Sequence, residues 1–187
     1  MIKLLVLDLD ETVVKNDMSF QEVRKRVRDR MGIKTNPRDF YEYLKKRGPE
    51  YLDALKREEI NRAKTAHPAP GLDELIRFCK KKGIRMAILT RNCREATYLA
   101  LGKYASEFDE IITRDDGFHP KPNPEAIVYL MKKYGATPKE TVVVGDYEYD
   151  IIAGKRAGCI TVRVGNGDGD YRVDNLRDLI KILENLE

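Results

Sequence analysis

The sequence has few cysteines and no long apolar run. Its three cysteines, Cys79, Cys93 and Cys159, are widely spaced and form no Cys-x-x-Cys pair, so neither a disulfide framework nor a cysteine-based zinc site is predicted. No apolar run approaches the roughly 20 residues that a membrane helix needs, and no signal-peptide pattern opens the chain. We therefore expect a protein of the reducing cytoplasm that does not bind a membrane.

The chain also lacks a strong excess of charge of either sign. Its 35 basic and 31 acidic residues leave a net charge of +4, with no arginine-rich tail and no alternation of basic and aromatic residues. These features argue against nucleic-acid binding, whereas a mildly basic surface favours small anionic molecules. The 187 residues suffice for one domain, or for one domain that carries a large insert.

Apolar runs and helix-period segments alternate along most of the chain. The first apolar run covers residues 4–7, and the alternation is regular from residue 72 onward. Further strands are predicted at 84–89, 110–113, 141–144 and 159–164, and helices at 72–82, 95–104, 125–134, 149–157 and 175–186. Strands separated by helices predict an α/β fold, a Rossmann-like parallel sheet with right-handed crossovers and helices on both faces.

The segment after the first strand breaks this alternation. Apolar spacing predicts three helices there and no strand, at about 20–31, 37–47 and 50–63. Asn36 is predicted to be the N-cap of the second helix. We interpret residues 16–68 as a small helical cap inserted after the first strand, and residues 1–15 and 69–187 as the core domain.

Carboxylates end two of the predicted strands. Asp8 and Asp10 are two residues apart, so in an extended chain both point the same way. Taken alone, such acids are as often turn formers or helix caps. Asp146 ends another predicted strand, and Asp150 lies one helical turn later. Like charges at one edge of a sheet need a cation, and oxygen ligands favour a hard ion such as Mg²⁺.

A hydroxyl and a lysine follow other strands. Thr90 lies where a loop or a helix N-terminus can offer N–H groups to phosphate, although a threonine between a strand and a helix is more often a plain helix cap. Lys121 stands among prolines, and this rigid context favours a bound anion. Arg91 and Asn92 border the same place, where capping and surface exposure also explain them. Because ligands of parallel sheets bind at the carboxyl ends of strands, we expect a phosphate site there.

Four short motifs resemble those of the haloacid dehalogenase (HAD) superfamily, in the same order. They are DLDET (8–12), ILTRN (88–92), HPKPNP (119–124) and VVGDYEYD (143–150). The resemblance covers nearly the whole chain, and the insert resembles the small helical cap of the phosphoglycolate phosphatase and β-phosphoglucomutase branch. It implies a Mg²⁺-dependent phosphomonoester hydrolase that acts on a small phosphorylated metabolite through an aspartyl-phosphate, as a monomer or a homodimer.

The resemblance also implies a role for each motif residue. Asp8 would be the nucleophile, and Asp10 the general acid and base. Mg²⁺ would be bound by Asp8, the backbone carbonyl of Asp10 and Asp146, with Asp150 in support. The transferring phosphate would be bound by Thr90, Arg91, Asn92 and Lys121. Of these, Lys121 would also be catalytic, because it neutralises charge on the phosphoryl oxygens.

Two positions depart from the family pattern. Glu11 stands where many relatives have glycine, which places the turn after Asp10 in question. Tyr147 stands where serine or threonine is common, which places the hydrogen bonding around Asp146 in question.

Other readings of the function stay open. A mutase or phosphotransferase of the β-phosphoglucomutase kind keeps both acids of the first motif, and a catalytically silent phosphate-binding protein can share the fold. A basic run in the insert is either a solvated face or a set of contacts to a carboxylate or second phosphate of the substrate. It comprises Lys56, Arg57, Arg62 and Lys64.

Overall fold

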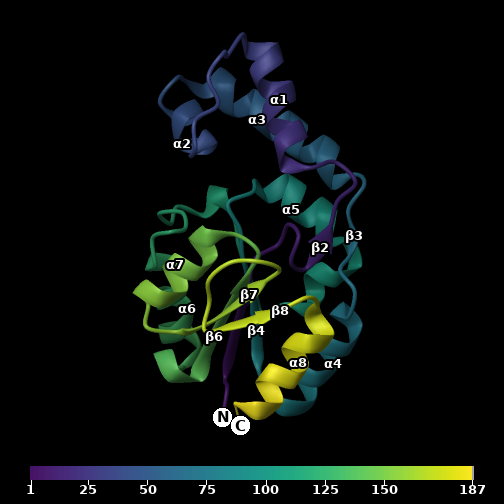
Figure 1. Cartoon of the computed structure of the whole chain (residues 1–187), viewed down its shortest axis with the longest axis vertical. Coiled ribbons are helices and arrows are strands. Elements are labelled where there is room, and N and C mark those ends of the chain that lie inside the picture. Colours follow the sequence, from purple (N-terminus) through teal and green to yellow (C-terminus); the bar gives the residue numbers. More distant parts are fainter. Residues whose placement is uncertain (187) are drawn as a thin grey trace.

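A six-stranded sheet forms the centre of the computed structural model, which describes residues 1–186 (Figure 1). Its strand order is β5-β4-β1-β6-β7-β8, and every neighbouring pair is parallel. The strands are β1 (Leu4–Leu7), β4 (Arg85–Leu89), β5 (Glu110–Ile112), β6 (Thr141–Gly145), β7 (Ile160–Val164) and β8 (Tyr171–Val173). Strand β1 therefore lies inside the sheet, between β4 and β6.

Strand β1 is buried on both faces because all its residues are apolar. Leu4, Leu5 and Leu7 are 0% exposed, and Val6 is 1% exposed. Leu5 and Leu7 join the hydrophobic cluster on one face of the sheet, and Leu4 and Val6 join the cluster on the other, as the two-residue period of a strand requires. Such a continuous apolar strand is typical of a parallel sheet that helices cover on both sides.

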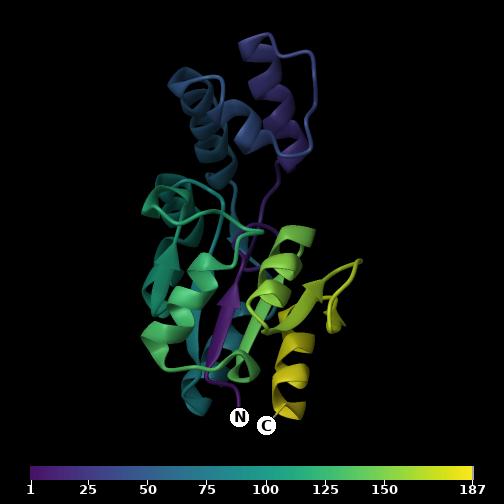
Figure 2. The ribbon, with the colours of Figure 1, turned by 90° about the vertical axis from the view of Figure 1, so that its left-hand side faces the viewer.

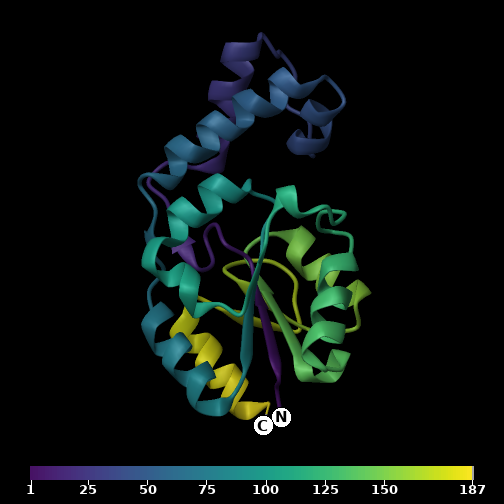
Figure 3. The same cartoon turned by 180° about the vertical axis from the view of Figure 1, so that it is seen from behind.

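Helices cover both faces of the sheet (Figures 1 and 3). One face is covered by α4 (Leu72–Lys82), α5 (Arg94–Leu101) and α8 (Leu176–Asn185). The other is covered by α6 (Glu125–Tyr134) and α7 (Glu148–Arg156). Short 3₁₀ helices are η1 (Gly102–Glu107), η2 (Arg114–Asp116) and η3 (Pro138–Glu140). The predicted α/β fold is confirmed.

Three further helices lie beyond the carboxyl end of β1 (Figure 2). They are α1 (Phe20–Met31), α2 (Phe40–Lys45) and α3 (Pro49–Ala63), and we call them the helical insert. They share an apolar cluster of their own, which includes Val23, Val27, Phe40, Leu44 and Leu55. The two chain segments that join the insert to the sheet pair as short antiparallel strands, β2 (Val14–Lys15) and β3 (His67–Pro68).

The second helix of the insert begins later than the sequence predicts. The prediction of Asn36 as its N-cap is wrong, because α2 begins at Phe40 and Asp39 is its cap. The Asp39 carboxylate accepts a hydrogen bond from the backbone N–H of Glu42 at 3.1 Å. The same carboxylate also pairs with Arg91 of the core, a long-range contact that helix-start patterns do not reveal.

The packing between α6 and the sheet leads to a stability prediction. We expect Ile127→Ala to lower the free energy of unfolding by about 2–5 kcal/mol, because it leaves a cavity in a tightly packed core, and Ile127 is 0% exposed. Urea denaturation followed by circular dichroism measures this change. The control Leu99→Ala alters a side chain that is 47% exposed, and its effect should stay within about 0.5 kcal/mol. Equal effects of the two substitutions would contradict the packing described.

Candidate active site

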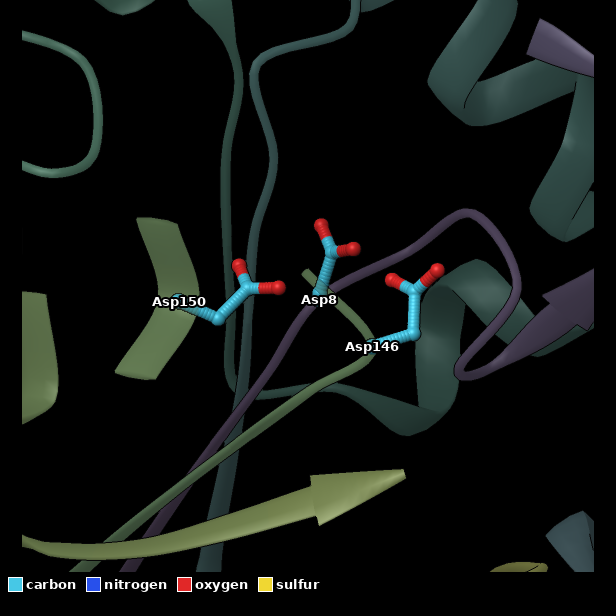
Figure 4. Close-up of side chains that lie close together, drawn as sticks. All are labelled: Asp8, Asp146 and Asp150. Atoms are coloured by element: carbon cyan, nitrogen blue, oxygen red, sulfur yellow. The ribbon is translucent and has the colours of Figure 1, made fainter. Parts of the chain in front are cut away.

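Three carboxylates meet at the carboxyl end of the sheet. Asp8 follows β1, Asp146 follows β6, and Asp150 lies in the first turn of α7. One oxygen atom from each carboxylate lies within 4.8 Å of the others, and the three side chains lie close together in Figure 4. Because β1 and β6 are adjacent parallel strands, their ends place Asp8 and Asp146 side by side.

The ammonium group of Lys121 lies against this cluster. Its Nζ donates to Asp8 Oδ1 at 3.0 Å, to Asp150 Oδ1 at 2.6 Å and to the backbone carbonyl of Leu89 at 2.6 Å. Lys121 is only 4% exposed. Burial alone lowers the pKa of Lys121, but the carboxylates of Asp150 and Asp8 outweigh burial and raise this pKa above its ordinary value. The ammonium is therefore charged and fixed beside Asp8.

One positive charge does not balance three partly or fully buried carboxylates. Burial, together with the nearby Asp8 and Asp150, raises the pKa of Asp146 to about 8. Burial and Asp8 also raise the pKa of Asp150 to about 6, although Lys121 opposes this shift. A divalent cation would relieve the repulsion, and carboxylate oxygens are the ligands that Mg²⁺ prefers. The donor set therefore fits such an ion.

Asp150 is held from two sides. Its Oδ1 accepts from Lys121, and its Oδ2 accepts from the backbone N–H of Tyr147 at 3.1 Å. Gly145 makes room for this side chain, since a Cβ atom at position 145 would lie 2.1 Å from Asp150 Oδ2. Because Tyr147 contributes its backbone to this bond, the bond does not depend on the serine or threonine common in relatives. Asp150 thus fixes Lys121 and the start of α7.

The carboxylate of Asp10 has partners outside the carboxylate cluster. Its Oδ1 lies 3.1 Å from Arg62 Nη1 and accepts from Asn16 Nδ2 at 3.2 Å. Its Oδ2 accepts from Asn92 Nδ2 at 3.0 Å. Arg62 belongs to the helical insert, and Asn16 lies between β2 and α1. The side chain of Asp10 therefore joins the core to the insert.

The predicted phosphate-binding residues after β4 lie close to the acids. Thr90 is 5% exposed, and its hydroxyl oxygen accepts from the backbone N–H of Asn92 at 3.0 Å. The side-chain amide of Asn92 donates to Asp10. Arg91 donates to both oxygens of Asp39, at 2.9 and 3.1 Å. In this arrangement the side chains of Asn92 and Arg91 therefore donate hydrogen bonds to carboxylates of the protein, those of Asp10 and Asp39.

A cavity of about 540 Å³ lies between the helical insert and the sheet. It is lined by all the predicted site residues, Asp8, Asp10, Thr90, Arg91, Asn92, Lys121, Asp146 and Asp150. From the insert it is lined by residues that include Phe20, Arg24, Phe40, Tyr41 and Leu55. Its volume is typical of a small-molecule site. A more open hollow of about 640 Å³, near α5 and β5, contains none of the predicted site residues.

A buried ion pair joins the helical insert to the core beside the cavity. Glu59 of α3 accepts two hydrogen bonds from Arg114 of η2, at 2.7 and 2.8 Å. Both side chains are at most 8% exposed. Burial raises the pKa of Glu59, and the Arg114 guanidinium offsets this only in part. The two residues belong to no motif and lie 55 positions apart, so sequence reasoning did not identify them.

The predicted basic run of the insert does not act as one group. Arg62 is buried and lines the cavity, whereas Lys56, Arg57 and Lys64 are exposed. Lys56 pairs with Glu95 of α5 at 3.3 Å. Arg62 therefore differs from its neighbours on α3 in both burial and partners.

Comparisons with known proteins agree with this geometry. The model of the haloacid dehalogenase-like hydrolase family matches residues 5–164. An uncharacterized hydrolase of Saccharomyces cerevisiae is 28% identical, over 99% of this chain and 92% of that protein. The pyrophosphatase PpaX of Halalkalibacterium halodurans is 31% identical, over 75% of this chain and 73% of that protein. Within residues 1–186, no helix is long and apolar enough to cross a membrane.

Solved structures share the whole fold. A hydrolase from Pseudomonas syringae has a TM-score of 0.79 at 22% identity, and the match covers 98% of each chain. A predicted phosphoglycolate phosphatase from Haemophilus somnus has a TM-score of 0.75 at 22% identity, with 97% of this chain and 98% of that chain covered. The family predicted from the four motifs is thus confirmed, and this chain belongs to the haloacid dehalogenase-like hydrolases.

Proposed function

We propose that this protein is a Mg²⁺-dependent phosphomonoester hydrolase that acts on a small phosphorylated metabolite through an aspartyl-phosphate intermediate. One observation carries the proposal. The Asp8 carboxylate lies at the end of β1, 3.0 Å from the Lys121 ammonium and beside Asp146 and Asp150, and all of these line one cavity. A nucleophile, a fixed cation and an oxygen-rich ion site therefore share one place.

The chain's own groups can perform both halves of the reaction. An Asp8 oxygen would attack phosphorus and form a P–O bond, while the ester P–O bond breaks and its electron pair stays on the leaving oxygen. Asp10 would give that oxygen a proton. In the second half, Asp10 would take a proton from the water that attacks phosphorus and releases Asp8. Lys121 and Thr90 would neutralise charge on the phosphoryl oxygens.

A bound Mg²⁺ would offset the repulsion between the Asp8 nucleophile and an anionic phosphate. The carboxylates of Asp8 and Asp146 and the backbone carbonyl of Asp10 would hold it. Each Asp150 oxygen already accepts a hydrogen bond, from Lys121 or from the backbone N–H of Tyr147. Asp150 would therefore support the ion site mainly by holding Lys121 in place. We expect no requirement for another cofactor.

We further propose that residues 16–68 act as a cap over a core formed by residues 1–15 and 69–187. The cavity has one wall from each part, so a closed insert would exclude water from a bound phosphate. Arg24 lines this cavity from α1, and its buried Nε has no hydrogen-bond partner within residues 1–186. Its Nη2 donates to the backbone carbonyls of Pro37 and Arg38, so Arg24 holds the segment between α1 and α2 beside the cavity.

The similarity to PpaX favours inorganic pyrophosphate as a second candidate substrate. Pyrophosphate is itself a small phosphate anhydride, so the same attack by Asp8 would release phosphate. A mutase would instead transfer the phosphoryl group to a second hydroxyl of a sugar phosphate, with the same two acids.

A substrate screen tests these candidates directly. We expect Mg²⁺-dependent phosphate release from p-nitrophenyl phosphate and from members of a panel of sugar phosphates, phosphoglycolate and pyrophosphate. Formation of a sugar-phosphate isomer without free phosphate would favour the mutase. If no compound is turned over and beryllofluoride does not bind, the result would favour the third candidate, a catalytically silent phosphate-binding protein.

The nucleophile is tested by Asp8→Asn. We expect a loss of turnover of at least about 10³-fold, because removal of a nucleophile eliminates the covalent route, while the circular dichroism spectrum stays unchanged. The matched control is Asp168→Asn, since Asp168 is an exposed acid outside the cavity. That variant should keep wild-type turnover. Retained turnover in Asp8→Asn would remove Asp8 as the nucleophile.

The metal site is tested by the thermal stability of Asp146→Asn. An acid whose pKa is raised on folding costs stability as pH rises from its unfolded pKa toward its folded pKa, which for Asp146 is about 8. Without Mg²⁺, Asp146→Asn should therefore have a higher melting temperature than the wild type at pH 8. The expected shift is about 2–4 °C for each kcal/mol by which the substitution raises the free energy of unfolding. The difference should shrink toward pH 4.

The same variant should respond differently to metal. Addition of Mg²⁺ should raise the melting temperature of the wild type and leave that of Asp146→Asn nearly unchanged. Asp168→Asn alters an exposed acid outside the cavity and should behave as wild type. A full Mg²⁺ response in Asp146→Asn would contradict the proposed ion site.

A further inference from the structure

Three side chains from three parts of the chain hold the carboxylate of Asp10. Oδ1 is contacted by Arg62 Nη1 at 3.1 Å and by Asn16 Nδ2 at 3.2 Å. Oδ2 has one such contact, from Asn92 Nδ2 at 3.0 Å. A carboxylate oxygen has two lone pairs, so Oδ1 is fully engaged and Oδ2 keeps one free. Oδ2 is therefore the oxygen that can carry a proton to and from the cavity.

Each guanidinium nitrogen of Arg62 has a partner in the protein. Its Nε donates to the backbone carbonyl of Met18 at 2.8 Å, its Nη2 donates to Glu11 Oε1 at 3.3 Å, and its Nη1 faces Asp10. Its side chain is 6% exposed. All three guanidinium nitrogens have protein partners, so in this arrangement Arg62 is fixed against Asp10 and orients it.

Glu11 completes this arrangement through a costly backbone conformation. Its φ is 61°, and among residues 1–186 it is the only residue other than glycine with a positive φ. Non-glycine side chains seldom adopt this region, and glycine would adopt it without strain. Only a side chain, however, supplies the carboxylate that accepts from Asn16 N at 3.3 Å, Asn16 Nδ2 at 3.4 Å and Arg62 Nη2 at 3.3 Å. Glu11 therefore holds both residues that engage Asp10 Oδ1.

These contacts cross from the core to the helical insert. Asp10 and Glu11 follow β1, whereas Arg62 lies in the last turn of α3. The contact between Arg62 and Asp10 exists only while α3 lies against the core, where the Glu59–Arg114 pair also holds it. The orientation of the Asp10 carboxylate thus depends on the docking of the insert.

We propose that Glu11 and Arg62 are positioning residues that orient Asp10 for proton transfer through Oδ2, so that acid and base catalysis requires the docked insert. The proposal rests on the proposed hydrolase function. In the first half-reaction Oδ2 gives its proton to the leaving oxygen as the ester P–O bond breaks. In the second, Oδ2 takes a proton from the water whose oxygen bonds to phosphorus as the P–O bond to Asp8 breaks.

Arg62→Ala and Glu11→Gly test the proposal, with Arg57→Ala as the control. Arg57 is an exposed arginine on the same helix. For alkyl phosphomonoesters, whose leaving group needs a proton, we expect kcat to fall about 10²-fold in both variants, since general acid and base catalysis is worth about 10²–10⁴. KM should change less than threefold, and Arg57→Ala should match wild type. Glu11→Gly removes the carboxylate and relieves the positive φ, so it tests the proposal even if Arg62→Ala folds poorly.

Stopped-flow measurements with p-nitrophenyl phosphate separate positioning from a loosened structure. Its leaving group departs without protonation, so both variants should keep a p-nitrophenol burst of about one per active site, followed by slow hydrolysis of the aspartyl-phosphate. A merely structural role would reduce the burst, raise KM for every ester and slow all substrates alike, and this result would overturn the proposal.

A double-mutant cycle with Asp10→Asn completes the test. If Arg62 and Glu11 act through Asp10, then Arg62→Ala and Glu11→Gly should cause no further loss of kcat in the Asp10→Asn background. An undiminished loss in that background overturns the positioning role and leaves the hydrolase function intact. A wild-type protein that releases no phosphate from any ester overturns the hydrolase function, and the positioning role with it.

Discussion

The site depends on one buried ammonium group. Lys121 Nζ joins Asp8 at the end of β1, Asp150 at the start of α7 and the carbonyl of Leu89 at the end of β4. Without this charge the carboxylates would repel one another in a poorly solvated place. The ammonium leaves the cluster negative, however, and the raised pKa of Asp146 records that excess. The fold thereby favours a divalent cation at the point where an anionic phosphate would approach Asp8.

Much of the fold and of the cluster could be predicted from sequence, because local patterns encode them. Continuous apolar runs mark the buried strands, and the rule that ligands bind at their carboxyl ends brings Asp8, Lys121 and Asp146 together. The contacts of the helical insert could not be predicted in this way. Glu59 and Arg114 meet across 55 positions, and Arg62 and Glu11 across 51. Such pairs depend on how helices pack, which local periodicity does not specify.

The two departures from the family pattern have different consequences. Tyr147 contacts Asp150 through its backbone N–H, so its side chain does not alter that hydrogen bond. Glu11 adopts a left-handed conformation, and its carboxylate binds Arg62 and Asn16. The turn after Asp10 thus becomes a connection between β1 and the helical insert. A chain with glycine at position 11 would have the turn without this connection.

Chemical trapping of the phosphoryl group shows directly whether Asp8 carries it. Protein mixed with Mg²⁺ and a substrate found in the screen is quenched during turnover, reduced with borohydride and digested for mass spectrometry. Borohydride reduces an acyl phosphate to an alcohol, so we expect Asp8 alone to be converted to homoserine, and only when substrate is present. Phosphate release with Asp8 unmodified, or conversion of a different carboxylate, would contradict the proposed role of Asp8 as the nucleophile.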